Sequence, residues 1–193
     1  KSAVRRRLRE REIYFLDIIE IDGRDVLFKV GCEAGTYIRK LIHDMGLKLG
    51  TNAHMQQLVR VKAGPFTDKE WHSLLELKDA YEFYLQGDDR MLRRVIRPIE
   101  DAVVNTRKVW ILDNAVDAIC HGSSLYAAGI AKINSGIMRG NNVAIMTLKD
   151  ELIGIGKAVY DSNGMKKHDK GIAVKIEKVF MERGKYPKLL RKI

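Results

Sequence analysis

Apolar and polar positions follow two different periods in the first third of the chain. Two β-prone runs lie within residues 13–30, separated by the Asp22-Gly23 pair, which is typical of a tight turn. Apolar residues then recur at steps of three and four over residues 36–49, and Gly50 follows. The pattern predicts a β-hairpin and then an amphipathic helix, with Thr36 as the N-cap residue of that helix.

The middle of the chain shows weaker patterns. Residues 54–62 have the composition of another strand, which Gly64-Pro65 ends. Three short helical patterns follow, at 71–77, 80–85 and 91–96. The aromatic residues among them are predicted to lie in the core: Trp71, Tyr81, Phe83 and Tyr84.

The pattern of residues changes near 105–108, where we expect a domain boundary. Short β-prone runs, frequent glycines and one helical pattern then alternate. Strands are expected at 109–112, 143–148, 152–160 and 172–180, a helix at 115–121, and a turn at Gly129-Ile130. This arrangement predicts a small β-barrel with residues 143–148 in its core.

The distribution of charge favours a polyanionic partner. The chain carries 35 Lys and Arg against 25 Asp and Glu, a formal net charge of +10. Residues 1–65 carry +5, residues 66–107 carry −2 and residues 108–193 carry +7. Two basic blocks suit a nucleic acid, although a solvated, lysine-rich surface would have the same composition.

Several other classes of protein are disfavoured. No run approaches the roughly 18 consecutive apolar residues of a membrane span, and the basic N-terminus leads into no apolar signal segment. Cys32 and Cys120 are far apart, and the scattered His and Cys residues suit neither a zinc site nor a disulfide framework. We therefore expect an intracellular, reducing compartment and no bound metal.

Two basic features are candidates for contact with phosphate. One is the N-terminal arm, because an arginine can hold a phosphate with two hydrogen bonds. The candidate RNA-binding residues of the arm are Lys1, Arg5, Arg6, Arg7 and Arg9. The other is residues 35–39, where Gly35 permits close approach, the helix start offers free N–H groups and Arg39 can reach across. On spacing alone, an ordinary helix start with a surface arginine is the simpler interpretation.

The run from Gly35 to Phe66 closely resembles a motif region of RNA pseudouridine synthases. The residues that carry the resemblance are Gly35-Thr36-Tyr37-Ile38-Arg39, Gly46, Leu49-Gly50, Ala53-His54, Leu58, Arg60, Gly64 and Phe66. The chain looks most like the dyskerin-type branch of archaea and eukaryotes, the catalytic subunits of H/ACA guide-RNA particles.

The rest of the chain resembles the PUA domain of the same family. The matching residues are residues 108–111, His121-Gly122, residues 129–132, Gly140, residues 143–151, residues 171–174 and Tyr186-Pro187-Lys188. The resemblance implies an α+β fold. Residues 1–107 would form the C-terminal portion of a mixed or antiparallel-sheet catalytic domain, residues 108–185 a β-barrel PUA domain, and residues 186–193 a tail.

The family implies roles for three residues of the first part. Arg39 is expected to pair with a catalytic aspartate and to help hold a flipped-out target nucleotide. Leu58 matches a position that lines the uracil pocket, and Tyr37 is expected to support that pocket. In this family an aspartate attacks the uridine, the glycosidic bond breaks, and the base is rejoined through carbon. No metal or organic cofactor is expected.

The catalytic aspartate has no counterpart in these 193 residues. The family carries it in a motif of the Gly-Thr-Leu-Asp-Pro type, and no aspartate here has these neighbours. The first residues resemble an internal point of the family. We therefore expect that roughly the first half of the catalytic domain is missing from this chain. We also expect that the chain alone is inactive, and that residues 1–100 are stable only with the missing segment.

The resemblance implies that the barrel grips the lower stem and the 3′ ACA trinucleotide of a guide RNA. The candidate RNA-binding residues are Gly122, Ser124, Gly129, Ile130, Lys132 and Arg139. Alternatively, these glycines only form barrel corners. His121 is expected to bond to nearby backbone rather than to act in catalysis.

Three interpretations stay open. The first is a guide-dependent pseudouridine synthase subunit that works on rRNA or tRNA with small protein subunits of the H/ACA particle, in the cytoplasm of an archaeon or the nucleolus of a eukaryote. The second is a non-catalytic, PUA-containing RNA-binding adaptor, which would not need Arg39 and Leu58 in active-site register. The third is a basic structural protein, whose behaviour with RNA would not depend on salt.

Overall fold

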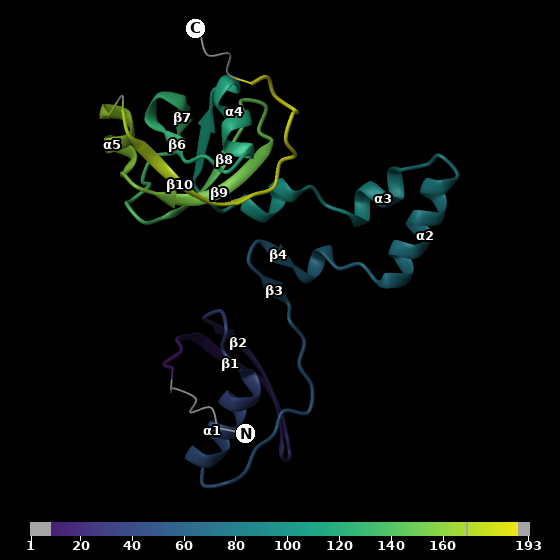
Figure 1. Ribbon diagram of the computed structural model, residues 1–193. Helices are drawn as coiled ribbons and strands as arrows, with labels where there is room; N and C mark the ends of the chain where they lie inside the picture. Colours follow the sequence, from purple (N-terminus) through teal and green to yellow (C-terminus); the bar gives the residue numbers. More distant parts are fainter. Residues whose placement is uncertain (1–8, 169, 189–193) are drawn as a thin grey trace, which may run out of the picture. The chain divides into compact units, whose positions relative to one another are not determined.

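The computed structural model describes residues 9–168 and 170–188. Contacts divide the chain into two compact units, residues 1–59 and residues 60–193 (Figure 1). The first unit contains a hairpin and one helix, and the second contains short helices and a barrel-like sheet.

The first unit confirms the predicted hairpin and the predicted helix. Its elements are β1 (Ile13–Asp22), β2 (Asp25–Cys32) and α1 (Ile38–Lys48). Phe15 lies opposite Gly31, and its ring occupies the space that a side chain at Gly31 would take. Gly46 is the buried residue of α1, because the backbone of Ala53 packs directly against it. The chain after α1 is therefore held against the helix.

The hairpin has little cover within the described residues. The exposed fractions of Ile18, Ile19 and Ile21 are 60%, 61% and 63%. Phe15 and Leu16, 45% and 36% exposed, are neighbours in a regularly paired stretch of β1, so their side chains point to opposite faces of the sheet. Both faces thus expose apolar surface, although a two-stranded sheet alone is only marginally stable in water.

The predicted strand at residues 54–62 is wrong over most of its length. Its last residue belongs to the short β3 (Lys62–Ala63), which pairs with β4 (Phe66–Thr67) around Gly64-Pro65. Residues 52–61 have no regular structure. The physical reason is that no strand among the described residues lies beside them to accept or donate ladder hydrogen bonds.

The helical patterns after residue 66 form a small helical segment. Its elements are η1 (Asp68–Glu70), α2 (Leu74–Leu85), α3 (Arg90–Val95) and η2 (Ile99–Val103). Residues 74–77 of the first predicted pattern and the whole of the second, 80–85, belong to the one helix α2, and residues 71–73 lie before it. It begins at a capping box, in which the Glu76 N–H donates to the Ser73 hydroxyl at 3.1 Å and the Ser73 N–H donates to the Glu76 carboxylate at 2.6 Å.

The prediction that the aromatic residues of this segment lie in the core is wrong. They are all about half exposed: Trp71, Tyr81, Phe83 and Tyr84. The buried residue of α2 is Ala80. Among the described elements α2 packs mainly against α3, and that contact covers only one narrow side of the helix.

The last part of the chain forms a six-stranded, barrel-like sheet in the strand order β6-β10-β9-β8-β5-β7. Its elements are β5 (Lys108–Ile111), α4 (Asp113–Cys120), β6 (Leu125–Tyr126), η3 (Ala127–Gly129), β7 (Ile130–Ile133), β8 (Asn142–Met146), β9 (Leu152–Ala158), α5 (Ser162–Lys167) and β10 (Ile172–Val179). The pairs are antiparallel except β5 with β8, which is parallel. The predicted small β-barrel is confirmed, as is the α+β class.

Two glycines let this sheet curve. A side chain at Gly154 would meet the Lys178 carbonyl oxygen at 2.5 Å, and one at Gly156 would clash with the Lys175 carbonyl oxygen. The register of β9 against β10 shifts between these two contacts. Glycine and a bulge together bend the two strands, which is how small barrels turn their corners.

The core of the second unit lies inside the barrel. Fully buried side chains from different strands meet there, with Val109, Ile145 and Ile153 among them. The prediction that residues 143–148 are core holds for residues 143–147, but Leu148 is half exposed, because it lies in the turn after β8.

The short helix η2 packs on the barrel rather than on α2. Val103 belongs to a buried cluster with Ala144, Met146 and Leu152. The Leu152 N–H donates to the Glu100 carboxylate at 2.8 Å. Contact with the barrel thus begins before residues 105–108, where the sequence predicts the domain boundary.

Three further observations concern what the described residues contain. Cys32 and Cys120 are free thiols. Across residues 9–168 and 170–188, no group of three or more His, Cys, Asp or Glu side chains has the arrangement of a metal site. In the same ranges, no helix has both the length and the apolar character needed to cross a membrane.

Candidate functional site

The loop before α1 leaves the start of this helix open. Gly35 has a φ of +85°, which a glycine adopts without strain, and the Arg11 guanidinium lies beside it. The Thr36 hydroxyl donates to the Glu33 carbonyl oxygen at 2.7 Å, so the prediction that Thr36 caps the helix is wrong. Tyr37 is the N-cap residue, and its side chain accepts no capping hydrogen bond. The positive end of the helix dipole is therefore available to an anion.

Two of the predicted pocket residues, Tyr37 and Arg39, lie at this end of α1. The third, Leu58, belongs to the chain that continues after the other end of the helix. Tyr37 is 81% exposed and Arg39 is exposed one residue into α1. Arg39 forms no ion pair with any residue that the structure describes. Leu58, half exposed, belongs to the extended chain that Gly46 and Ala53 hold against α1. A cation, an aromatic ring and a half-exposed apolar side chain thus belong to the surface of this unit.

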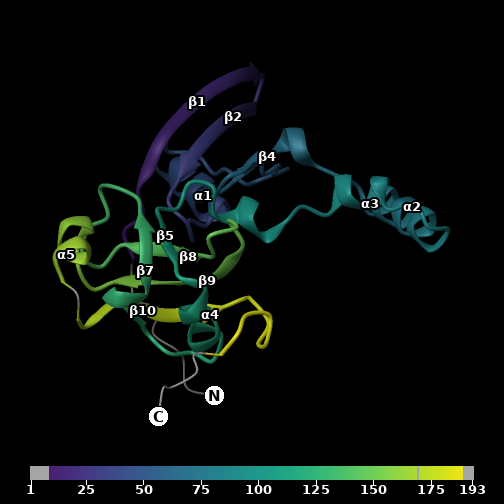
Figure 2. The same cartoon turned by 90° about the horizontal axis from the view of Figure 1, so that it is seen from above.

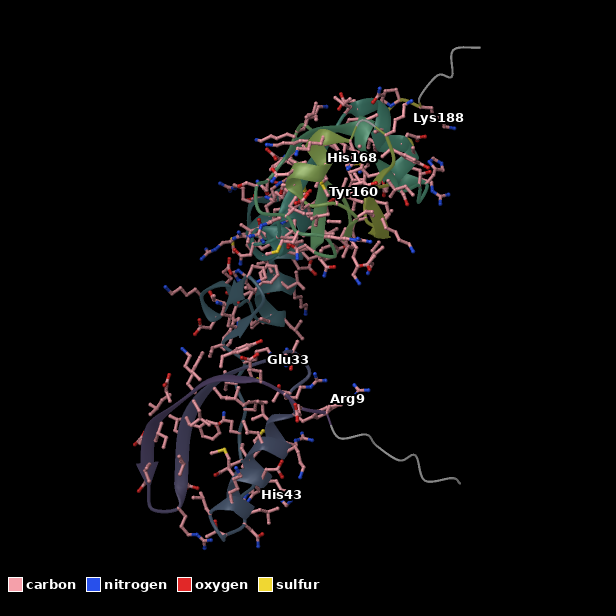
Figure 3. The ribbon with its side chains drawn as sticks, turned by 90° about the vertical axis from the view of Figure 1, so that its left-hand side faces the viewer. Arg9, Glu33, His43, Tyr160, His168 and Lys188 are labelled. Carbon is pink, nitrogen blue, oxygen red and sulfur yellow. The ribbon has the colours of Figure 1, made fainter. Side chains whose placement is uncertain are left out.

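The arginine arm is only partly visible. Lys1, Arg5, Arg6 and Arg7 lie outside the described residues. Arg9 is exposed (Figure 3), and Arg11 forms an ion pair with Glu33 at 3.3 Å.

Gly122 ends α4 and faces open space. Its φ is +87°, and its N–H donates to the Ile119 carbonyl oxygen at 2.8 Å, as in a helix C-terminal cap. A side chain at Gly122 would meet no atom within 4 Å. His121 has its Nδ1 2.8 Å from the Asp117 carbonyl oxygen, which confirms the prediction that it bonds to nearby backbone. Close approach of a ligand is therefore possible at Gly122.

Gly129 has a different surrounding. A side chain there would lie 3.1 Å from the Ala115 Cβ and 3.3 Å from the Leu125 Cδ1. The glycine therefore lets η3 approach α4 closely. Packing explains this glycine without a ligand, as the simpler alternative supposes, whereas the neighbouring Ser124 and Ile130 are partly exposed.

Lys132 lies on the outer side of β7, held by an aromatic ring. Its Nζ is 4.5 Å from the centre of the Trp110 ring, and the two residues are direct partners across β5 and β7. The Trp110 indole N–H donates to the Asp150 carboxylate at 2.7 Å. Lys132 is thus a fixed cation, stabilised by about 0.5–1 kcal/mol through the ring.

Arg139 lies toward the opposite end of β7 from Gly129. β7 begins at Ile130, paired with Ile111, and ends at Ile133, paired with Val109. Arg139 follows beyond that far end, so the length of the strand, about 10 Å, separates it from the Gly129 end.

At the far end, Arg139 lines an open hollow of about 650 Å³ with Met138, Val159, Tyr160 and Asp161. The Tyr160 ring packs against His168, with ring centres 4.7 Å apart (Figure 3). Two separate stretches of the chain, residues 138–139 and 159–161, meet in this hollow.

One polar cluster was missed by the sequence analysis. The Tyr186 hydroxyl donates to the Glu151 carboxylate at 2.5 Å, and the Thr147 hydroxyl donates to the same oxygen at 3.0 Å. The hydrogen bond from Tyr186 lowers the pKa of Glu151, and the same bond raises the pKa of Tyr186. The two residues are 35 positions apart, so no local pattern could have paired them.

Family models match both parts of the chain. The model described as tRNA pseudouridylate synthase B C-terminal domain matches residues 39–104. The model described as PUA domain matches residues 107–180.

Curated relatives match along almost the whole chain. A probable tRNA pseudouridine synthase B of Pyrococcus horikoshii is 56% identical over 191 residues, which are 98% of this chain and 57% of the relative. The protein of the same name from Methanocaldococcus jannaschii is 49% identical over 193 residues, all of this chain and 57% of the relative. The chain spans little more than half the length of these relatives.

Solved structures agree with this match. A Cbf5-Nop10-Gar1 complex contains a chain that is 54% identical, with a TM-score of 0.88 over 98% of this chain and 58% of that one. An H/ACA RNP bound to a substrate RNA containing 2′-deoxyuridine gives 54% identity and a TM-score of 0.87, over 95% of this chain and 58% of that one.

Proposed function

We propose a function for this chain from its family, because it belongs to the RNA pseudouridine synthases of the archaeal tRNA pseudouridine synthase B and Cbf5 type. It contributes part of the active site and an RNA-binding surface of a guide-dependent pseudouridine synthase. Its partners would be an H/ACA guide RNA, a substrate RNA and small protein subunits of that particle. The observation that carries the proposal is Arg39, an exposed cation at the open start of α1 in the register of the family motif.

In the proposed mechanism Arg39 pairs with an aspartate carboxylate that these 193 residues do not supply. That carboxylate attacks the flipped-out uridine, the N1–C1′ glycosidic bond breaks, the base turns and a C5–C1′ bond forms. The carboxylate is then released, C5 loses its proton to solvent and N1 gains one. Tyr37 and Leu58 would give the base an aromatic and an apolar neighbour. The chain by itself would then bind RNA but not turn it over.

The activity test compares the chain alone with the chain plus the N-terminal catalytic segment of the Pyrococcus horikoshii relative. Tritium release from a guided substrate RNA labelled at uridine C5 measures the reaction. We expect release only from the mixture, and its loss in Arg39→Ala with partial retention in Arg39→Lys, which keeps the charge. Release by the chain alone would refute the assignment of the nucleophile to a polypeptide outside these residues.

The exposed hairpin supports the same division of the active site. Apolar side chains face both sides of β1, and each strand has a free edge among the described residues. We propose that the N-terminal catalytic segment covers this sheet. Amide exchange in residues 13–32 should be fast in the chain alone and slow in the mixture. Strong protection without the added segment would contradict the proposal.

For the barrel, we propose a guide-RNA contact along Gly122, Ser124, Ile130 and Lys132, with the domain boundary near residues 105–108. The open space at Gly122 and the fixed charge of Lys132 support it, and the two family models meet between residues 104 and 107. Affinity for a hairpin RNA with a single-stranded 3′ ACA should fall steeply with salt. An equal affinity for a hairpin without the ACA would show nonspecific binding and would contradict a specific guide-RNA contact.

A further inference from the structure

The chain after β10 forms a strap, residues 180–188, which runs beside α4 in both views (Figures 1 and 2). At its start the Phe180 and Met181 N–H groups both donate to the Ile153 carbonyl oxygen, at 2.9 and 3.1 Å. Met181 and Tyr186 pack against the barrel core. The strap is therefore held at two points, with residues 182–185 exposed between them.

The second point is a polar latch on the turn between β8 and β9. Tyr186 donates to Glu151, which also accepts from the fully buried Thr147. The Lys149 Nζ lies 5.6 Å from the centre of the Tyr186 ring. A buried threonine fixes the position of the acceptor, so this latch has a defined geometry.

Between the two points the strap carries an arginine without a carboxylate partner among the described residues. Arg183 is exposed and forms no ion pair there, whereas the neighbouring Lys185 pairs with Glu182 at 3.5 Å. Met181 and Tyr186, on either side of Arg183, pack against a buried cluster that includes Ile119 and Cys120, the last two residues of α4. The Arg183 guanidinium also opposes the rise in pKa that burial causes in the Cys120 thiol. The strap thus passes beside the helix that Gly122 closes (Figures 1 and 2).

A purely structural role for Arg183 has one candidate. Asp117, also near Cys120, is buried, and its Oδ1 has no hydrogen-bond partner in the described part of the chain. A role in neutralising Asp117 would make Arg183 important for stability. A role toward RNA would make it important for binding and for the salt dependence of binding.

We propose that the strap is an additional RNA contact, in which Tyr186 positions the segment and Arg183 binds a phosphate next to Gly122. The planar guanidinium suits two hydrogen bonds to one phosphate, and the open space at Gly122 leaves room for an RNA backbone. The inference rests on the proposed RNA-binding function of the barrel.

The test titrates the full chain with the ACA-tailed hairpin RNA over a range of salt concentrations. Arg183→Ala should weaken binding several-fold and lower the slope of log affinity against log salt by about 0.7–0.9, the value for one phosphate contact. Arg183→Lys should keep most of the slope. Tyr186→Phe should weaken binding in the same direction, and Glu151→Gln provides a second variant of the latch. The matched control is Lys166→Ala, which removes one charge from α5, on the opposite side of the barrel from α4 (Figures 1 and 2).

The outcomes separate the two proposals. Wild-type affinity and slope in Arg183→Ala would overturn the strap contact and leave RNA binding by the barrel intact. A lower melting temperature with an unchanged slope would also overturn it, because Arg183 would then serve Asp117. Equal slope losses in Arg183→Ala and Lys166→Ala would show a diffuse charge effect and no strap site. Absence of salt-dependent binding by the wild-type chain would overturn both proposals.

Discussion

Gly129→Ala separates packing from ligand approach at a glycine where the two interpretations compete. The added Cβ would lie 3.1 Å from the Ala115 Cβ and 3.3 Å from the Leu125 Cδ1. Carbon atoms prefer separations of about 3.5–4.0 Å. The backbone at Gly129 is outside the left-handed region, so an alanine is strained only by these contacts.

The expected cost is set by how far the neighbours must move. Overpacked cores lose about 1–3 kcal/mol, and two contacts short by a few tenths of an ångström belong at the lower end. We expect a loss of about 1 kcal/mol, which corresponds to a fall in melting temperature of about 4–8 °C for a domain of this size. Thermal unfolding followed by circular dichroism measures it.

Ala115→Gly provides the matched control, because it removes the nearer of the two atoms. Alone it should cost about 0.5–1 kcal/mol through lost helix propensity. The double variant should be more stable than the sum of the single changes by about 0.5 kcal/mol or more. Strict additivity would refute the packing argument. If the double variant regains stability but not RNA affinity, Gly129 also serves ligand approach.

Three further outcomes are expected. Gly122→Ala, at a φ of +87° with no nearby atom, should cost about 1–2 kcal/mol through backbone strain alone; a chemical-denaturation midpoint equal to wild type would contradict this. Ile153→Ala removes a fully buried side chain and should cost about 2–5 kcal/mol in urea unfolding, and a smaller loss would mean that the barrel closes over the cavity. Tyr186→Phe should lower the melting temperature over a limited pH range. The latch lowers the pKa of Glu151, so its stabilisation is present above the ordinary value of 4.5 and is lost as pH falls further. It raises the pKa of Tyr186, so the stabilisation is also lost as pH rises above 10.0. A difference in melting temperature between wild type and Tyr186→Phe that does not change with pH would contradict the assigned hydrogen bond.

Local pattern by itself determined the elements whose stability is mostly local. The Asp22-Gly23 turn, the period of α1 and the long strands of the barrel follow from neighbours in sequence. The register of the family motif likewise singled out Arg39, because a motif is read along the chain. β6 and β7 were missed, since two to four residues are too few to show a period and are strands only because β10 and β5 lie beside them.

Tertiary structure alone decided what depends on distant partners. The extended chain at residues 54–61 is β-prone but has no neighbouring strand among the described residues, so composition could not make it a strand. Trp71 and Tyr84 have large aromatic side chains and are still half exposed. An apolar side chain is buried only where another element packs against it, which the local sequence does not show. Arg139 is separated from the Gly129 end by the length of β7. The latch between Tyr186 and Glu151 joins residues that only the fold brings within a hydrogen bond of each other.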